Sequence, residues 1–392
     1  MARLSVLMLA SCYFIYHADA VLAQNAAPPA SRATQSNPKP STQRTGDLGA
    51  TADELLRGQS KVDVNAGTVT IITNRVLGGP IMTSVLDLSA LLDAGERFEK
   101  MRVIPMVARG KMQNVWDILY LRGVDMGYVQ TDSLEYLKDD PSINSIRERL
   151  RYIALMFPEE IHIIARSDIG SLEDLAGKKV GINAKGTGSS LTGPIILRRL
   201  GIDAHVEYED ANIALERMRT GDLAATVYVL AKPAVPVAQI KGEGFHILPI
   251  PYARFQDLYL PSTFTSKEYP NLIPEGEEVQ TIAVGNLLAV YNWPEGSERY
   301  MKVARFTDAF FSRFSELLKP GFHPAWKQVN LAATVQGWKR FKPAQEWIDA
   351  YTKDPLRTQF DAFLKQKGIS GDSKTMFEDF LGWRTRSGNN SE

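Results

Sequence analysis

The sequence of 392 residues contains little cysteine and little histidine. Its one cysteine, Cys12, lies near the N-terminus, which excludes an intrachain disulfide framework and a CxxC site for redox chemistry or metal binding. The five histidines are scattered, without the HExxH or HxH spacing that is typical of zinc ligands. The sequence therefore predicts no metal site and no cofactor.

An excess of charge of one sign is also absent. Lysine and arginine together number 45, aspartate and glutamate together number 45, and the net charge is zero. Nucleic-acid-binding proteins normally have a basic excess, so this balance argues against a nucleic-acid partner. A charged small ligand stays possible, because one local charge is enough to bind it. Beyond the N-terminal segment there is no apolar run of about 18 residues, so we expect a protein that does not span the membrane.

The first residues have the pattern of a secretory signal peptide. Arg3 supplies a positive charge, and an apolar stretch follows over residues 4–16. Signal peptidase accepts small residues at positions −3 and −1 of its cleavage site, and Ala20 and Ala23 each end such a pattern. The prediction is a signal peptide over residues 1–23 and export to the periplasm.

Two further features concern the N-terminal region. Residues 9–12, Leu-Ala-Ser-Cys, fit a lipobox, so lipid anchoring at Cys12 is an alternative to simple cleavage. It is the less favoured one, because the apolar stretch continues beyond the cysteine to residue 16. Residues 24–59 are rich in alanine, proline, serine and threonine and lack apolar periodicity, which predicts a disordered linker.

The remaining sequence alternates between short β-branched runs and segments with helical apolar spacing. Strands that alternate with helices predict an α/β fold with a parallel sheet covered on both faces. The expected strands are 68–73, 101–107, 124–129, 151–157, 161–165, 179–182, 204–208, 223–229, 245–250 and 281–290, and the main expected helices are 112–121, 191–200, 211–218, 298–318 and 345–365. Residues 252–279 contain three prolines and are expected to form a loop.

The alternation falls into two α/β blocks that are joined by two chain crossings. We expect lobe I over residues 60–157 and 286–392, and lobe II over residues 158–285, with a hinge between them. Each lobe is then a mostly parallel sheet flanked by helices. Ligands of open α/β sheets bind at the carboxyl ends of strands, and two such lobes can close on a ligand in the cleft between them.

Several phrases of the sequence carry a family resemblance. They are VDMGYVQ at 124–130, EIHIIAR at 160–166 with SLEDLAGKKVGI at 171–182, GTGSS at 186–190, and YPNLI at 269–273 leading into TIAV at 281–284. Together they resemble the TAXI-type solute-binding subunits of TRAP transporters, which have the two-lobed type II periplasmic binding protein fold. The loop at 74–80 departs from the glycine-rich loop followed by tyrosines that those subunits usually have, which leaves the ligand open.

The resemblance implies a receptor that captures a small organic anion, such as a carboxylate, and delivers it to a TRAP-type membrane permease. It implies no enzymatic activity. The sequence has no GxSxG motif and no Walker loop ending in Gly-Lys-Ser or Gly-Lys-Thr. Two alternatives stay open: a binding protein of the same fold that serves an ABC importer or a sensor, and a periplasmic enzyme.

The strongest candidate for ligand contact is the loop Gly186-Thr187-Gly188-Ser189-Ser190. It follows an expected strand and opens an expected helix, so its backbone N–H groups and hydroxyls suit a carboxylate or a phosphate. The alternative is an ordinary helix cap provided by Ser189 or Ser190.

The corresponding loop of lobe I supplies Asn74, Arg75, Gly78 and Gly79 as candidates. Arg75 could form a bidentate pair with a ligand carboxylate. The alternative is a solvent-exposed arginine in a turn.

Three more candidates lie at the carboxyl ends of strands. Gln130 can donate and accept hydrogen bonds, and Thr131 follows it. Tyr228 could stack on a ligand or hydrogen bond to it. The alternatives are a helix-capping role for Thr131 or Asp132 and a core position for Tyr228.

Overall fold

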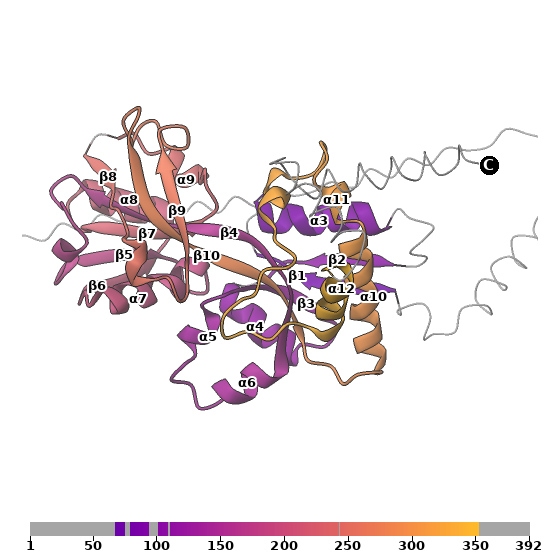
Figure 1. Ribbon diagram of the computed structural model, residues 1–392. Coiled ribbons are helices and arrows are strands. Elements are labelled where there is room, and N and C mark those ends of the chain that lie inside the picture. Colours follow the sequence, from indigo (N-terminus) through magenta and orange to yellow (C-terminus); the bar gives the residue numbers. More distant parts are fainter. Residues whose placement is uncertain (1–66, 75–78, 94–100, 109, 243, 353–392) are drawn as a thin grey trace, which may run out of the picture. The chain divides into compact units, whose positions relative to one another are not determined.

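The computed structural model describes residues 67–74, 79–93, 101–108, 110–242 and 244–352. Within these ranges ten strands form a sheet with the order β2-β1-β3-β10-β4-β7-β5-β6, while β8 pairs with β4 and β9 pairs with β10 (Figure 1). The strands are β1 Thr68–Ile72, β2 Arg102–Met106, β3 Met126–Gln130, β4 Leu150–Arg166, β5 Lys179–Asn183, β6 His205–Glu209, β7 Ala225–Leu230, β8 Phe245–Ile247, β9 Leu260–Thr265 and β10 Glu278–Tyr291.

The helices lie mainly between these strands, as the alternation of the sequence predicts. They are α3 Pro80–Asp93, α4 Lys111–Tyr120, α5 Ser133–Tyr136, α6 Ile143–Arg149, α7 Gly188–Leu200, α8 Ala211–Arg219, α9 Val235–Ala238, α10 Glu298–Ser312, α11 Phe314–Leu317 and α12 Lys342–Thr352, with short 3₁₀ turns at Glu173–Leu175, Tyr252–Arg254 and Pro324–Gln328. The pairs β1–β2, β1–β3, β5–β6 and β5–β7 are parallel, so helical crossovers connect them.

Two long antiparallel strands, β4 and β10, run through the middle of the sheet (Figure 1). The later half of β10 pairs with β3, and the later half of β4 pairs with β7. The buried apolar residues form separate clusters toward the two ends of these strands. Two clusters draw their members from 69–157 and 287–348, and the other two draw theirs from 161–284.

We call the part that contains the clusters from 69–157 and 287–348 lobe I, and the part that contains the clusters from 161–284 lobe II. The two-lobed α/β class expected from the sequence is confirmed. The exact boundaries expected at 157/158 and 285/286 stay a prediction.

The sequence predicts two strands separated at Pro158, and this prediction is wrong, because β4 continues from Leu150 to Arg166. Pro158 lies opposite Gly285 on β10, and the register of β10 shifts between Gly285 and Leu287. Proline has no N–H for the ladder, and a bulge is one of the places in a sheet where it is tolerated. The irregularity of β10 therefore accommodates a residue that normally ends a strand.

The loop expected over 252–279 is also partly wrong, because it contains β9. Pro261 is tolerated there, since β9 pairs with β10 at the edge of the sheet. The helix expected over 298–318 is divided at Arg313 into α10 and α11. The helix expected over 345–365 begins earlier, at Lys342, and its continuation past residue 352 lies outside the described residues.

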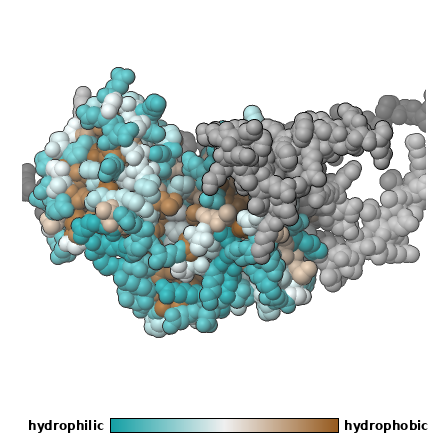
Figure 2. Space-filling view, in the orientation of Figure 1, coloured by the Kyte–Doolittle hydropathy of each residue, from teal (hydrophilic) through white to brown (hydrophobic). Residues whose placement is uncertain are grey.

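None of the helices in the described ranges has both the length and the apolar character that crossing a bilayer requires. Figure 2 shows one face of the molecule, on which hydrophilic residues predominate and hydrophobic areas are small. The expected signal peptide, the expected linker and Cys12 all lie outside the described residues.

Candidate functional site

A cavity of about 490 Å³ lies where residues of the two lobes meet. Lobe I contributes the end of β1 and the start of α4, the crossing strand β4 contributes Glu159, and lobe II contributes the ends of β5, β6 and β7 with the start of α7. The lining residues are Asn74, Gly110, Lys111, Glu159, Asn183, Ala184, Thr187, Gly188, Ser189, Asp210, Val229 and Leu230. We call this space the interlobe cavity. Strand ends converge on it, as expected for an open α/β sheet.

The lobes touch directly beside the interlobe cavity. The backbone N–H of Lys111 donates to the carbonyl oxygen of Gly186 at 2.8 Å. A Cβ atom placed on Gly110 would lie 2.0 Å from that same oxygen. Gly110 has an extended backbone, with φ 168°, so its glycine is required by space rather than by conformation. Any side chain at this position would force the two lobes apart.

A second contact between the lobes is centred on Asp132, which is fully buried. Its Oδ2 accepts hydrogen bonds from the hydroxyl of Thr192 at 2.7 Å and from that of Tyr259 at 2.9 Å, both in lobe II. Burial raises the pKa of Asp132 to about 6, against the lowering effect of these two hydrogen bonds and of the more distant Lys111. When the lobes are in contact, the carboxyl group of Asp132 is therefore buried and hydrogen-bonded to two hydroxyl groups of lobe II.

The wall of the cavity contains an ion pair that is almost completely buried. The ammonium Nζ of Lys111 lies 2.7 Å from Oε2 of Glu159 and 2.6 Å from Oδ1 of Asn286. The side chains of Lys111 and Glu159 are only 5% and 6% exposed. Asn286 also donates to Glu159, at 3.2 Å, so the three side chains form one closed network. Buried charges are tolerated when they are paired and hydrogen-bonded in this way.

Helix α7 begins at the cavity, and Thr187 is its N-cap. The Thr187 hydroxyl accepts from the N–H of Ser190 at 3.3 Å, so the cap is neither Ser189 nor Ser190. The Ser190 hydroxyl donates to the Thr187 carbonyl, and the Ser189 hydroxyl accepts from the N–H of Val229 at 2.9 Å. The backbone N–H groups of Gly188 and Ser189 occupy the first turn, where a helix offers no acceptor. These N–H groups and the O–H of Ser189, which only accepts from Val229, are donors that a bound anion could use.

Most of the residues predicted from the GTGSS loop lie at or next to the cavity. Thr187, Gly188 and Ser189 line it, while Gly186 makes the contact with lobe I described above and Ser190 belongs to the cap. From the lobe I loop, Asn74 lines the cavity. Gly79 precedes α3 and its carbonyl accepts from Thr83, whereas Arg75 and Gly78 lie outside the described residues.

Gln130 and Thr131 are buried behind the lining. Gln130 donates to Thr192 at 3.4 Å, and its Oε1 has no partner among the described residues. The amide group of Gln130 packs against Gly188, because a Cβ atom on that glycine would lie 3.0 Å from Oε1 and 3.1 Å from Nε2. Thr131 instead lines a smaller cavity of about 220 Å³ next to Tyr259 and Gly285.

Tyr228 does not take part in the interlobe cavity. It is fully buried in an apolar cluster of lobe II, and its hydroxyl donates to the carbonyl of Ala211 at 3.2 Å. Burial also raises the pKa of its hydroxyl to about 12. Adjacent residues of a strand point to opposite faces, and here the neighbouring Val229 lines the cavity while Tyr228 is directed into the core.

Sequence reasoning did not find Lys111, Glu159 or Asp210. Each is a single charged residue outside any motif, and the network around Lys111 joins positions that are 48 and 175 residues apart. One signal was available. Lys111 begins a helix that directly follows a strand of a parallel sheet, and Asp210 follows the carboxyl end of β6.

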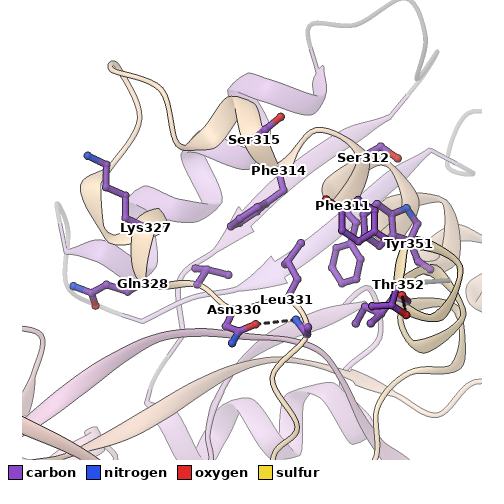
Figure 3. A pocket seen from close by; sticks show the side chains of 14 residues that line it. Phe311, Ser312, Phe314, Ser315, Lys327, Gln328, Asn330, Leu331, Tyr351 and Thr352 are labelled. Carbon is purple, nitrogen blue, oxygen red and sulfur yellow. Dashed lines mark hydrogen bonds between the residues drawn. The ribbon is translucent and has the colours of Figure 1, made fainter. Parts of the chain in front are cut away.

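A larger cavity, of about 760 Å³, lies within lobe I. Figure 3 shows Phe311, Phe314 and Leu331 directed toward its interior. Trp347 and Tyr351 line it from α12, where their rings stack with centroids 5.2 Å apart. We call this space the lobe I cavity. It contains none of the residues that the sequence predicts as ligand contacts. The described residues include no group of three or more histidine, cysteine or acidic side chains that could hold a metal ion.

The chain is similar to one protein family and to several solved structures. The model of the NMT1-like family matches residues 87–338. Similar solved structures include the periplasmic aliphatic sulphonate binding protein SsuA from Escherichia coli, 12% identical over 80% of this chain and 82% of that chain, with a TM-score of 0.38. The periplasmic binding protein BugD is 14% identical over 77% and 98%, with a TM-score of 0.41. The periplasmic VFT2 domain of BvgS from Bordetella pertussis is 12% identical over 68% and 97%, with a TM-score of 0.37.

Proposed function

Because the chain belongs to the NMT1-like family, we propose that it is an extracytoplasmic solute-binding receptor that holds a small organic anion, such as a carboxylate, in the interlobe cavity. One observation carries the proposal: the cavity is lined by residues of both lobes, which also touch each other beside it. A ligand that contacts both lobes stabilises their closed arrangement.

The anion preference has two supports. Gly188 and Ser189 line the cavity from the first turn of α7, and a helix N-terminus carries a partial positive charge. The ammonium group of Lys111 lies in the same wall and has three donors, of which Glu159 and Asn286 use two. We propose that the third N–H of Lys111 donates to a ligand oxygen.

We propose that the receptor performs no covalent chemistry. Two hydroxyls line the cavity: that of Ser189 accepts from the N–H of Val229, and that of Thr187 donates to the carbonyl of Ala184, so neither is hydrogen-bonded to a general base among the described residues. No histidine or cysteine occurs among the described lining residues to act as base or nucleophile.

The finer assignment is to the TAXI type, with a TRAP-type membrane permease as the partner that receives the ligand. It rests on the sequence phrases quoted above. A gene for a permease with many membrane spans beside this one, and capture of that permease by the ligand-loaded protein, are the expected results. An adjacent gene for an ABC permease or a sensor kinase would instead favour the corresponding alternative.

The decisive experiment blocks each of the two larger cavities separately. Ala184 is half-buried in the lining of the interlobe cavity, and Ala332 is exposed in the lining of the lobe I cavity. Protein lacking residues 1–23 is screened with organic acids by thermal shift. A ligand at a hundred times its Kd should raise Tm by roughly 5 °C. Ala184→Trp should abolish the shift and Ala332→Trp should retain it. The reverse pattern, or no shift with any acid, would overturn the proposal.

A further inference from the structure

A small cavity lies between the two lobes at the place where β10 changes its neighbour. β10 pairs with β9 of lobe II up to Ala283, and with β3 of lobe I from Asn286 onward. Gly285 lies between these two pairings and lines the cavity of about 220 Å³ that Thr131 also lines. We call this space the hinge cavity. Because β9 and β3 belong to different lobes, the width of the hinge cavity depends on how the lobes are oriented.

Both lobes contribute to the walls of the hinge cavity. Lobe I supplies Thr131 and the loop 334–336, and lobe II supplies the segment 256–260 that leads into β9. These residues and their neighbours in the chain fall within the described ranges, and none of them lines the interlobe cavity. A molecule that touches both walls stabilises the arrangement in which the lobes are in contact, because it loses one wall when they separate.

The hydroxyl of Thr131 is the group that indicates a ligand. Thr131 is 8% exposed, and its Oγ1 is buried without a hydrogen-bond partner among the described residues. The backbone of Thr131 is paired: its N–H donates to Gly285 and its carbonyl accepts from Trp338, both at 2.9 Å. A buried hydroxyl without a partner destabilises the protein, and a ligand atom that hydrogen bonds to it removes this cost.

The other described polar groups of the hinge cavity suit an uncharged ligand. Gln256, Thr334 and Gln336 offer amide and hydroxyl groups, which can both donate and accept hydrogen bonds. The carboxylate of Asp257 is already bound by the guanidinium of Arg199, at 2.7 and 2.9 Å. Ligand hydroxyls match such a lining, because each of them can also donate and accept.

The size of the hinge cavity limits the ligand further. A volume of about 220 Å³ equals the space of roughly seven water molecules. Leu155, Leu258 and Val335 line the same space and provide apolar contacts for a carbon chain. We propose that the hinge cavity binds a small uncharged polyol, and that this binding stabilises the lobes in contact and so strengthens binding in the interlobe cavity. The coupling rests on the proposed receptor function, whereas binding of the polyol does not.

Glycerol is the probe, and saturation-transfer NMR detects its binding without any organic acid. Protein lacking residues 1–23 should transfer saturation to glycerol. Leu260→Trp should lose most of this signal, because Leu260 lines the hinge cavity and a larger side chain fills it. Leu86→Trp is the matched control, since Leu86 is similarly exposed on α3 and is not among the residues that line this cavity, and it should keep the signal. Equal signals in the two variants would overturn the site.

Thr131→Val tests the hydroxyl itself. The variant keeps the shape of the side chain, so it should weaken glycerol binding by about two- to tenfold. It should not lower the Tm of the protein without glycerol, because the hydroxyl has no partner among the described residues to lose. A lower Tm with unchanged glycerol binding would assign the hydroxyl a structural role and overturn its part in the site.

Calorimetry with the organic acid that gives the largest thermal shift measures the coupling. Saturating glycerol should lower the Kd of this acid by about fivefold or more in the wild-type protein and in Leu86→Trp, and should leave it unchanged in Leu260→Trp. An equal change in the two variants would be a solvent effect of glycerol and would overturn the coupling. Failure of every acid to bind would overturn the receptor function and the coupling with it, while the NMR result still decides whether the hinge cavity binds a polyol.

Discussion

The interlobe cavity and the lobe I cavity differ in what forms their walls. The lobe I cavity is the larger, about 760 Å³ against about 490 Å³, and its walls are mainly aromatic and aliphatic residues of one lobe. The interlobe cavity is lined by amides, backbone N–H groups and charged residues from both lobes. Binding of a ligand in the interlobe cavity depends on the distance between the lobes, and binding in the lobe I cavity does not. We therefore place the proposed site where polar groups from separate elements converge, and not in the larger cavity.

The ion pair in the interlobe cavity should give the largest effect. Lys111→Met leaves the carboxylate of Glu159 buried without its cation, and the free energy of unfolding should fall by about 3–5 kcal/mol. The double variant Lys111→Met/Glu159→Gln should recover most of this loss. Urea denaturation measures both. An equal loss of unfolding free energy in the single and the double variant would mean that the loss does not come from the unpaired charge of Glu159.

The lobe I cavity should respond in stability alone. Phe311 is 3% exposed, and its ring lies 5.2 Å from that of Trp347. Phe311→Ala should lower the free energy of unfolding by about 3 kcal/mol through the cavity that it leaves. The affinity for an organic acid, measured by calorimetry below the melting transition, should not change. A parallel loss of affinity would remove the distinction between the two cavities.

Contact between the lobes should be needed for affinity. Gly110→Val places a side chain against the carbonyl of Gly186 and should weaken ligand binding by about a hundredfold, which corresponds to roughly 2.7 kcal/mol. Gly170→Val is the control, since a Cβ atom there meets only Asp174, at 3.6 Å. X-ray scattering should show that the Gly110 variant no longer becomes more compact with ligand. Unchanged affinity would mean that binding does not require this contact.

Affinity should also depend on pH through Asp132. Its pKa is about 6 when the lobes are in contact and about 3.9 when the carboxyl is exposed to water, so the closed arrangement binds the proton more tightly. Lowering the pH through 6 therefore favours closure, and the gain is lost as the pH rises again. Binding should be about tenfold tighter at pH 5 than at pH 7. Asp132→Asn should remove the dependence, and a dependence that persists would assign it elsewhere.

The sequence predicted the α/β alternation well, because each βα unit is specified locally by apolar spacing and turn residues. The loop 186–190 could be located for the same reason, since a strand, two glycines and a helix start follow one another. Tyr228 shows where local reasoning stops. Its position at a strand end was compatible with both a ligand contact and a core residue, and only the neighbouring α8 and β4 decide between the two.

Long-range pairing explains what the sequence did not reveal. Lys111, Glu159 and Asn286 look like ordinary polar residues along the chain and become one network only when β4 and β10 pair. The same pairing explains Pro158. A proline predicts a strand end from local chemistry, but the irregular register opposite it on β10 removes the conflict.

That irregularity also affects how the molecule can deform. Both connections between the lobes are strands of one sheet, and Pro158 and Gly285 lie opposite each other near the middle of these two strands. Proline supplies no donor to the ladder and glycine no side chain, so resistance to bending is lowest at this point. We expect a tilt of one lobe against the other to be concentrated at this pair of residues. We expect that closure on a ligand changes the twist of the sheet at this pair and requires no loop to refold.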